Sequence, residues 1–96
     1  MQLDTVKDYL DITWQDTATD SKVASILKRA ESTIKKYLGG EVDFTDETTE
    51  EAQLLLDCCR YIWNHAFEDF ENNFGRQLYA LRAERSVNAV EQNTGV

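Results

Sequence analysis

Apolar side chains recur every three or four residues between Val23 and Leu38, and the intervening positions are largely polar. At about 100° per residue, this spacing places the apolar residues on one stripe of a helix. Thr19 or Asp20 precedes the stripe as the expected N-cap, and Gly39 follows it in a position that suits a left-handed residue. The pattern predicts a long helix buried on one side. The stripe consists of Val23, Ile26, Leu27, Ala30, Ile34, Tyr37 and Leu38.

A shorter periodic segment opens the chain, with apolar side chains at Val6, Tyr9 and Leu10. Asp4 or Thr5 is the expected cap, and the helix is expected to end near Ile12. The polar stretch 13–20 then predicts a loop that holds Trp14. An aromatic residue in such a loop covers the core or, less often, anchors a partner. We therefore expect Trp14 to cover the core.

A third and longer helix is expected after Thr48 or Thr49, either of which can cap it. The preceding loop, 40–46, alternates Val42 and Phe44 in a way that suggests a brief extended stretch. Two apolar rows and one polar face follow the cap. The main row is Ala52, Leu55, Leu56, Cys59, Ile62, Trp63, Ala66, Phe67, Phe70 and Phe74; the second row is Leu54, Cys58, Tyr61 and His65; the polar face is Asp57, Arg60, Asn64, Glu68 and Glu71.

A helix that is apolar on two sides needs two covers. The second row therefore indicates either a contact with another subunit or burial by the C-terminal segment 75–90. That segment mixes apolar residues with arginines and lacks a single clean stripe, so it is either a helix or a docking arm. Its candidate residues for docking a partner are Leu78, Tyr79, Leu81 and Arg82.

The composition limits the fold class. The chain has 96 residues, no proline and four glycines, which favours an all-α protein with short connections. We expect a small bundle of three to four helices with a C-terminal docking segment, in which residues 1–90 form one domain and residues 91–96 a disordered tail. The second and third helices should share one core. Its expected members are Ile26, Leu27, Ile34, Tyr37, Leu55, Ile62, Trp63 and Phe67.

Charge is distributed unevenly along the chain. The net charge of −8 argues against a protein that grips nucleic acid. Six acids and no base lie in 39–51, whereas five bases and only one acid lie in 22–36. These segments are either solvated helix faces or complementary surfaces of neighbouring copies. For the second case, the candidate subunit interface is Lys28, Arg29, Lys36, Glu50, Glu51, Leu54, Cys58 and Tyr61.

No residue pattern predicts catalysis, and we expect no enzyme activity, metal or other cofactor. Cys58 and Cys59 are adjacent, which does not match the C-x-x-C spacing of zinc or redox sites, and buried thiols are expected. His65 is the only histidine and has no suitably spaced partner ligand. The chain also lacks a stretch of about 18 apolar residues and a signal-peptide pattern, so a cytoplasmic site of synthesis is expected.

The order of these segments resembles the small head-tail connector proteins of tailed bacteriophages, also called head-completion or adaptor proteins. The opening 3–12 contains Val-Lys-Asp-Tyr-Leu, which is similar to the family's Val-Lys-x-Tyr-Leu start. The segment 26–39 is similar to its Ala-x-x-x-Ile-x-x-Tyr-x-Gly helix. The segments 63–74 and 78–81 look like the third helix and tail of some members. The chain departs from the family in having no proline before the third helix.

The resemblance implies a structural protein that forms a ring, commonly of twelve copies, under the portal. It implies a portal protein on one rim and a head-closure, stopper or tail protein on the other, with DNA only passing through the ring and no membrane contact. The expected location is the head-tail junction of the virion, and the host bacterial cytoplasm during assembly. An acidic lumen would repel DNA phosphates and let the duplex slide.

A second interpretation belongs to a different class of protein. A small acidic helical regulator or inhibitor that binds a host protein would have the same size, charge and helix content. The mass of the protein in solution, or portal and terminase genes next to its own, would distinguish the two interpretations.

Overall fold

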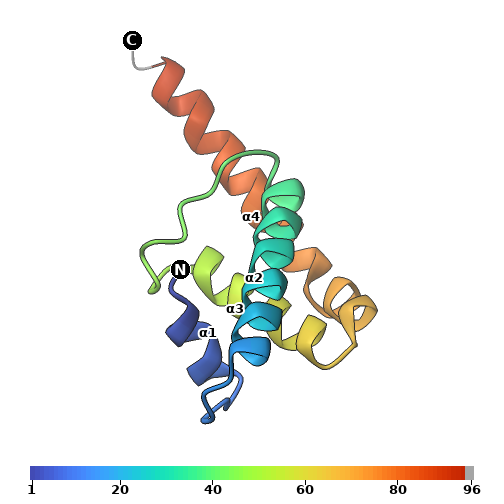
Figure 1. Ribbon diagram of the computed structural model, residues 1–96. Coiled ribbons are helices and arrows are strands. Elements are labelled where there is room, and N and C mark those ends of the chain that lie inside the picture. The colour runs from blue at the N-terminus through green and yellow to red at the C-terminus, as the bar shows by residue number, and fades with distance from the viewer. Residues whose placement is uncertain (95–96) are drawn as a thin grey trace.

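The computed structural model describes the backbone of residues 1–94 and the side chains of residues 1–86. The backbone over this range forms four helices and no strand, which confirms the predicted all-α class. The helices are α1 (Leu3–Tyr9), α2 (Thr17–Leu38), α3 (Glu50–Trp63) and α4 (Phe67–Thr94). Figure 1 shows α2 and α3 as a central pair; both α1 and α4 contact this pair. No helix within the described range is both long and apolar enough to cross a bilayer.

Both ends of α2 are fixed by local chemistry. The cap is Asp16, whose carboxylate accepts hydrogen bonds from the backbone N–H of Thr19 at 3.3 Å and from its hydroxyl at 3.0 Å. The predicted caps, Thr19 and Asp20, were therefore wrong: an earlier acid takes this role and Thr19 is its donor. At the other end Gly39 has φ of +80°, as predicted. A Cβ on Gly39 would also lie 3.3 Å from Nε of Arg82, but that atom is at the end of a flexible, exposed side chain, so the positive φ is the main reason for glycine here.

The first helix starts and ends earlier than predicted. Its N-cap is Gln2, which makes no side-chain cap, and the expected cap Thr5 instead donates its hydroxyl to Glu47 at 2.9 Å. The helix ends at Tyr9 because Asp11 takes a positive φ of 60°. The backbone N–H of Ile12 then donates to the carbonyl of Lys7 at 2.9 Å, and the Ile12 side chain is buried. This turn directs the chain back along α2.

The predicted third helix is two helices in the structure. His65 has φ of +57°, and the chain reverses there before α4 begins. The N–H of Ala66 donates to the carbonyl of Tyr61 at 2.8 Å and that of His65 to Ile62 at 3.1 Å, which is a Schellman ending. Glycine usually occupies this left-handed position. Because the chain has histidine there and the apolar spacing continues beyond it, the sequence gave no signal that the helix ends.

One core joins all four helices and the loop that precedes α3. Most of the predicted core residues are buried, whereas Tyr37, Trp63 and Phe67 are partly buried at its edge. Phe44 reaches the core from the loop without forming a strand. Trp14 is 50% exposed and donates its indole N–H to the hydroxyl of Thr19, so the prediction that it covers the core was wrong.

The second apolar row of α3 is covered by the chain itself. Leu54 and Cys58 are 1% and 0% exposed, which removes them from any subunit surface. Tyr61 is half-buried and its ring centroid lies 5.9 Å from that of Phe70 and 5.8 Å from that of Phe74, both on α4. Tyr61 is thus covered by residues that were expected to continue the same helix and that lie instead on α4, before the segment 75–90.

The C-terminal segment is a helix. Its candidate docking residues are divided: Leu78 and Leu81 are buried in the core, which is a correction, whereas Tyr79 and Arg82 are exposed. The helix extends to Thr94, so 91–94 of the expected disordered tail are helical, and residues 95 and 96 lie outside the described residues.

Candidate interaction surface

A groove lies between α2 and α4 and has a volume of about 460 Å³. It forms because the αL turn at His65 sends α4 back across α2. Three bases and three aromatic rings dominate its lining, and we call it the cationic groove. Its residues are Arg29, Thr33, Lys36 and Tyr37 from α2, and Phe67, Glu71, Tyr79 and Arg82 from α4.

The two sides of the cationic groove are tied by aromatic contacts. The hydroxyl of Tyr37 donates a hydrogen bond to Glu71, and the ring of Tyr37 lies edge-on to that of Tyr79 with centroids 6.3 Å apart. The guanidinium of Arg29 lies 5.3 Å from the ring centroid of Phe67. This is within the range of a cation–π contact. These contacts hold α2 and α4 at a fixed distance and leave the positive heads accessible.

The electrostatics of the cationic groove differ from those of the whole chain. Arg29, Lys36 and Arg82 face one acid, Glu71, in a protein with net charge −8. The hydrogen bond to Glu71 raises the pKa of Tyr37 to about 12, so the phenol stays neutral and remains a donor at physiological pH. The cationic groove therefore attracts anionic groups, carboxylates included.

The second charged feature is the loop of residues 40–49 that joins α2 to α3, which we call the acidic loop. Asp43 Oδ1 accepts from the N–H of Thr45 at 2.9 Å and from its hydroxyl at 2.6 Å. Asp46 repeats the arrangement with Thr48, at 3.0 and 2.6 Å. These hydrogen bonds lower the pKa of both carboxyls, which are therefore ionised at neutral pH.

Contacts to the core, to the N-terminus and to α3 hold the acidic loop in place. The side chain of Phe44 is buried in the core. Glu47 accepts from the backbone N–H of Gln2 at 3.1 Å as well as from Thr5. Thr49 caps α3 by accepting from the N–H of Ala52 at 3.1 Å, one of the two predicted caps. The acidic loop is thus a shaped surface, although it has no regular secondary structure.

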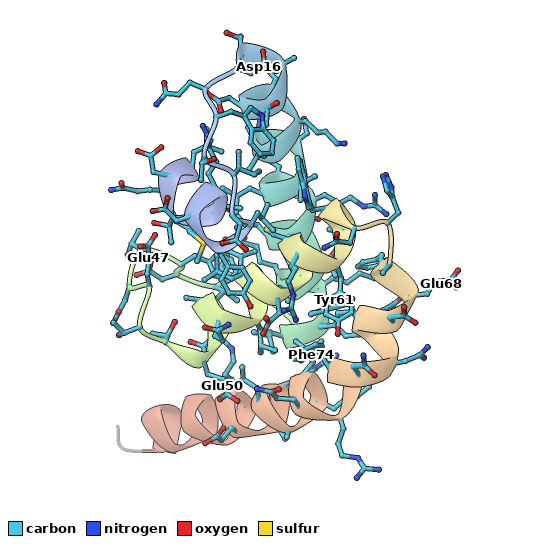
Figure 2. The ribbon with its side chains drawn as sticks, turned by 90° about the horizontal axis from the view of Figure 1, so that it is seen from below. Asp16, Glu47, Glu50, Tyr61, Glu68 and Phe74 are labelled. Carbon is cyan, nitrogen blue, oxygen red and sulfur yellow. The ribbon has the colours of Figure 1, made fainter. Side chains whose placement is uncertain are left out.

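The predicted interface residues fall into separate places. Arg29 and Lys36 line the cationic groove, while Lys28 is exposed outside it. Glu50 is exposed and accepts from Nε2 of Gln77 at 2.9 Å, and Glu51 is half-buried. The hydroxyl of Tyr61 accepts from Nδ2 of Asn73 at 3.2 Å. Figure 2 places Glu47 and Glu50 on the opposite side of the molecule from Glu68, at the start of α4.

Sequence reasoning missed part of this surface. Arg29, Thr33 and Lys36 have helical spacing, so the α2 side of the groove was visible in the sequence. The two Asp-x-Thr triplets that begin at Asp43 and Asp46 were also a readable signal of turns. Phe67 and Glu71 gave no such signal, because their position depends on the reversal at His65.

The thiols of Cys58 and Cys59 belong to α3, and the lone histidine, His65, is exposed just after the end of that helix. Cys58 and Cys59 are free and buried, and burial raises the pKa of each thiol to about 12. Within the described part of the chain, no group of three or more His, Cys, Asp or Glu side chains is placed to hold a metal ion.

Comparisons with known proteins do not place the chain in a family. No family model, no curated protein and no solved structure matches it.

Proposed function

We propose that the chain is a structural head-tail connector of a tailed phage or prophage. In this proposal, copies form a ring beneath the portal through which DNA passes and onto which a stopper or tail protein assembles. The observation that carries the proposal is the order of the family-like motifs along residues 3–82. Residues of the first two motifs also have structural tasks in this fold.

The first two motifs supply contacts that the fold needs. In the opening motif, Lys7 Nζ lies 2.7 Å from Asp20 Oδ1 and joins α1 to α2, while Tyr9 bonds to Asp57 and joins α1 to α3. In the second motif, Tyr37 bonds to Glu71 of α4 and Gly39 ends α2 in the left-handed conformation. The motif residues therefore orient the helices relative to one another.

The surface charge also fits a ring that DNA crosses. The chain carries net charge −8, so on balance it would repel a passing phosphate backbone. The bases in the cationic groove are a local exception, which suits a contact between proteins. A closed ring needs two different complementary faces on each copy, and the acidic loop and the cationic groove provide such a pair.

The decisive experiment mixes the purified chain with DNA-filled capsids that bear a portal but lack this protein. Bound density at the portal vertex, seen by electron microscopy or by co-sedimentation, is the expected result. Capsids without a portal are the control and should bind nothing. Full infectivity of particles made without this gene would contradict the proposal. Capture of a host protein together with no capsid binding would favour the regulator instead.

A further inference from the structure

The cationic groove holds three bases against one acid, Glu71, so its own charge is positive. Neither Arg29, Lys36 nor Arg82 forms an ion pair with any described residue. Tyr79 lies beside them with 62% of its surface exposed. Arginine and tyrosine in a shallow groove are the residue types that contribute most to binding at protein interfaces.

The acidic loop has the complementary chemistry. In both Asp43 and Asp46 the threonine donors use Oδ1, and Oδ2 takes no hydrogen bond from a described residue. Each carboxylate is therefore fixed by one oxygen and offers the other. Since the loop is already ordered by Phe44 and Glu47, little conformational entropy would be lost on binding.

Contacts near the start of the loop show that bases of α2 and α4 attract it. Lys35 Nζ lies 3.2 Å from Oε2 of Glu41, and Nη2 of Arg85 donates to the Glu41 carbonyl at 2.8 Å. No described bond, however, joins Asp43 or Asp46 to a base of the cationic groove. The acidic loop and the first turns of α4 lie on opposite sides of the α2–α3 pair (Figures 1 and 2), whereas Arg82, at the other end of the groove, lies beside Gly39, where the loop begins.

We propose that the cationic groove binds the acidic loop of a second copy of this chain, with Asp43 and Asp46 of one copy against Arg29, Lys36 and Arg82 of the next. The inference rests on the proposed function, in which successive copies must join through two different faces. A second copy is the occupant because the same sequence supplies both the bases and the carboxylates, and no described bond joins Asp43 or Asp46 to the groove within one copy. Such a contact is heterologous and repeats from copy to copy.

The net charge does not prevent this contact. Charges of equal sign on two copies repel, but at 0.15 M salt the screening length is about 8 Å, so distant charges contribute little. Carboxylates seated against guanidinium groups are closer than this and are partly dehydrated by the surrounding rings. Arginine binds a carboxylate through two parallel hydrogen bonds, which also sets the orientation of the loop.

The first test uses Lys36 as a chemical handle. Equal amounts of ¹⁵N-labelled and unlabelled full chain are mixed at about 1 mM protein, where even a millimolar dissociation constant leaves many copies associated. Carbodiimide then condenses lysine with a carboxylate in contact with it. The expected product joins Lys36 to Asp43 or Asp46 in peptides with one heavy and one light half. Absence of such mixed peptides would overturn the inference.

The second test separates the two faces. The groove variant carries Lys36→Glu and Arg82→Glu; the loop variant carries Asp43→Asn and Asp46→Asn, which keeps Oδ1 as an acceptor for the threonines. Either variant alone should associate at least tenfold more weakly than the parent in sedimentation. Their mixture contains one intact groove and one intact loop, so it should form heterodimers that do not grow further.

A matched control variant replaces Lys28 and Arg76 with glutamate. Both are exposed bases outside the cationic groove, one on α2 and one on α4, so the change in net charge is the same. This control should associate like the parent; equal weakening would show a net-charge effect and contradict the inference. Portal-bearing capsids separate the two proposals. If the groove variant still forms rings on portal-bearing capsids as well as the parent does, this contact is refuted and the connector role stands. If copies cross-link to one another but do not bind such capsids, the connector role is refuted and this contact stands.

Discussion

The phenolic hydroxyl of Tyr9 donates a hydrogen bond to Oδ1 of Asp57, and this bond joins α1 to α3. Asp57 is only 9% exposed, although its position in the sequence predicted a solvated face. Nη2 of Arg60 lies 3.8 Å from the same oxygen and provides a nearby positive charge. Burial, and then the hydrogen bond to Asp57, raise the pKa of Tyr9. The buried carboxylate of Asp57 thus has a hydrogen-bond donor and a nearby positive charge.

Replacement of Tyr9 by phenylalanine should lower the free energy of unfolding by about 1–2 kcal/mol, because the buried carboxylate loses its strongest neutral donor. Urea unfolding followed by circular dichroism measures this change. Tyr79→Phe is the control, since Tyr79 is exposed and makes no described hydrogen bond; it should change stability by less than about 0.5 kcal/mol. Equal stability of parent and Tyr9→Phe would show that the bond contributes nothing.

Replacing Phe70 or Trp63 with alanine should lower the free energy of unfolding by different amounts. Phe70 is fully buried, and Phe70→Ala should cost about 3–5 kcal/mol, enough to unfold much of a small domain. Trp63 lies partly exposed at the core edge with Lys22 Nζ 4.9 Å from its ring centroid, so Trp63→Ala should cost less, about 1–3 kcal/mol. Thermal unfolding compares them, and a larger loss for Trp63→Ala would reverse the assignment of these residues within the core.

His65 occupies a left-handed conformation that glycine adopts more easily. His65→Gly should therefore raise the free energy of unfolding by about 0.5–1 kcal/mol, since the exposed imidazole is not part of the core. Asn64→Gly is the control. Asn64 has a negative φ of −91°, so glycine at this position should not raise the free energy of unfolding. A loss of stability in His65→Gly would indicate a contact of the imidazole that supports the α3–α4 reversal.

The bond between Tyr37 and Glu71 predicts a specific loss of stability in alkali. The pKa of Tyr37 is raised from 10.0 to about 12 in the folded chain, so its contribution is complete below about pH 10 and disappears as pH rises toward 12. The difference in free energy of unfolding between the parent and Tyr37→Phe should be constant at pH 7–9 and should shrink above pH 10. The buried thiols titrate in both proteins. A difference that persists unchanged at pH 12 would contradict this linkage.

Residues with strictly local roles could be predicted from the sequence. The stripe of α2, the left-handed Gly39 and the cap Thr49 follow from spacing and from the chemistry of helix ends. The α2 cap was missed by a few residues because the stretch before it offers several aspartates and threonines. Which of several equivalent residues caps the helix depends on the backbone turn before it, and the sequence does not reveal that turn.

The candidate site was only half visible in the sequence. Its α2 side has a readable spacing, but Phe67, Glu71 and Tyr79 join it only because α4 reverses at His65. The same reversal places Phe70 and Phe74 of α4 against Tyr61, which an unbroken helix would have left on a second face. The left-handed conformation of His65 therefore explains why part of the expected interface was wrong, and it also determines where the groove lies.

Three helices, α1, α2 and α3, end in left-handed residues, namely Asp11, Gly39 and His65, and the sequence has no proline. Uncatalysed proline isomerisation takes tens of seconds and often delays the last molecules in a refolding population. Rotation about φ at these three positions has no comparable barrier. Refolding from urea should therefore finish without a slow minor phase, and newly made chains should reach the native state without a prolyl isomerase.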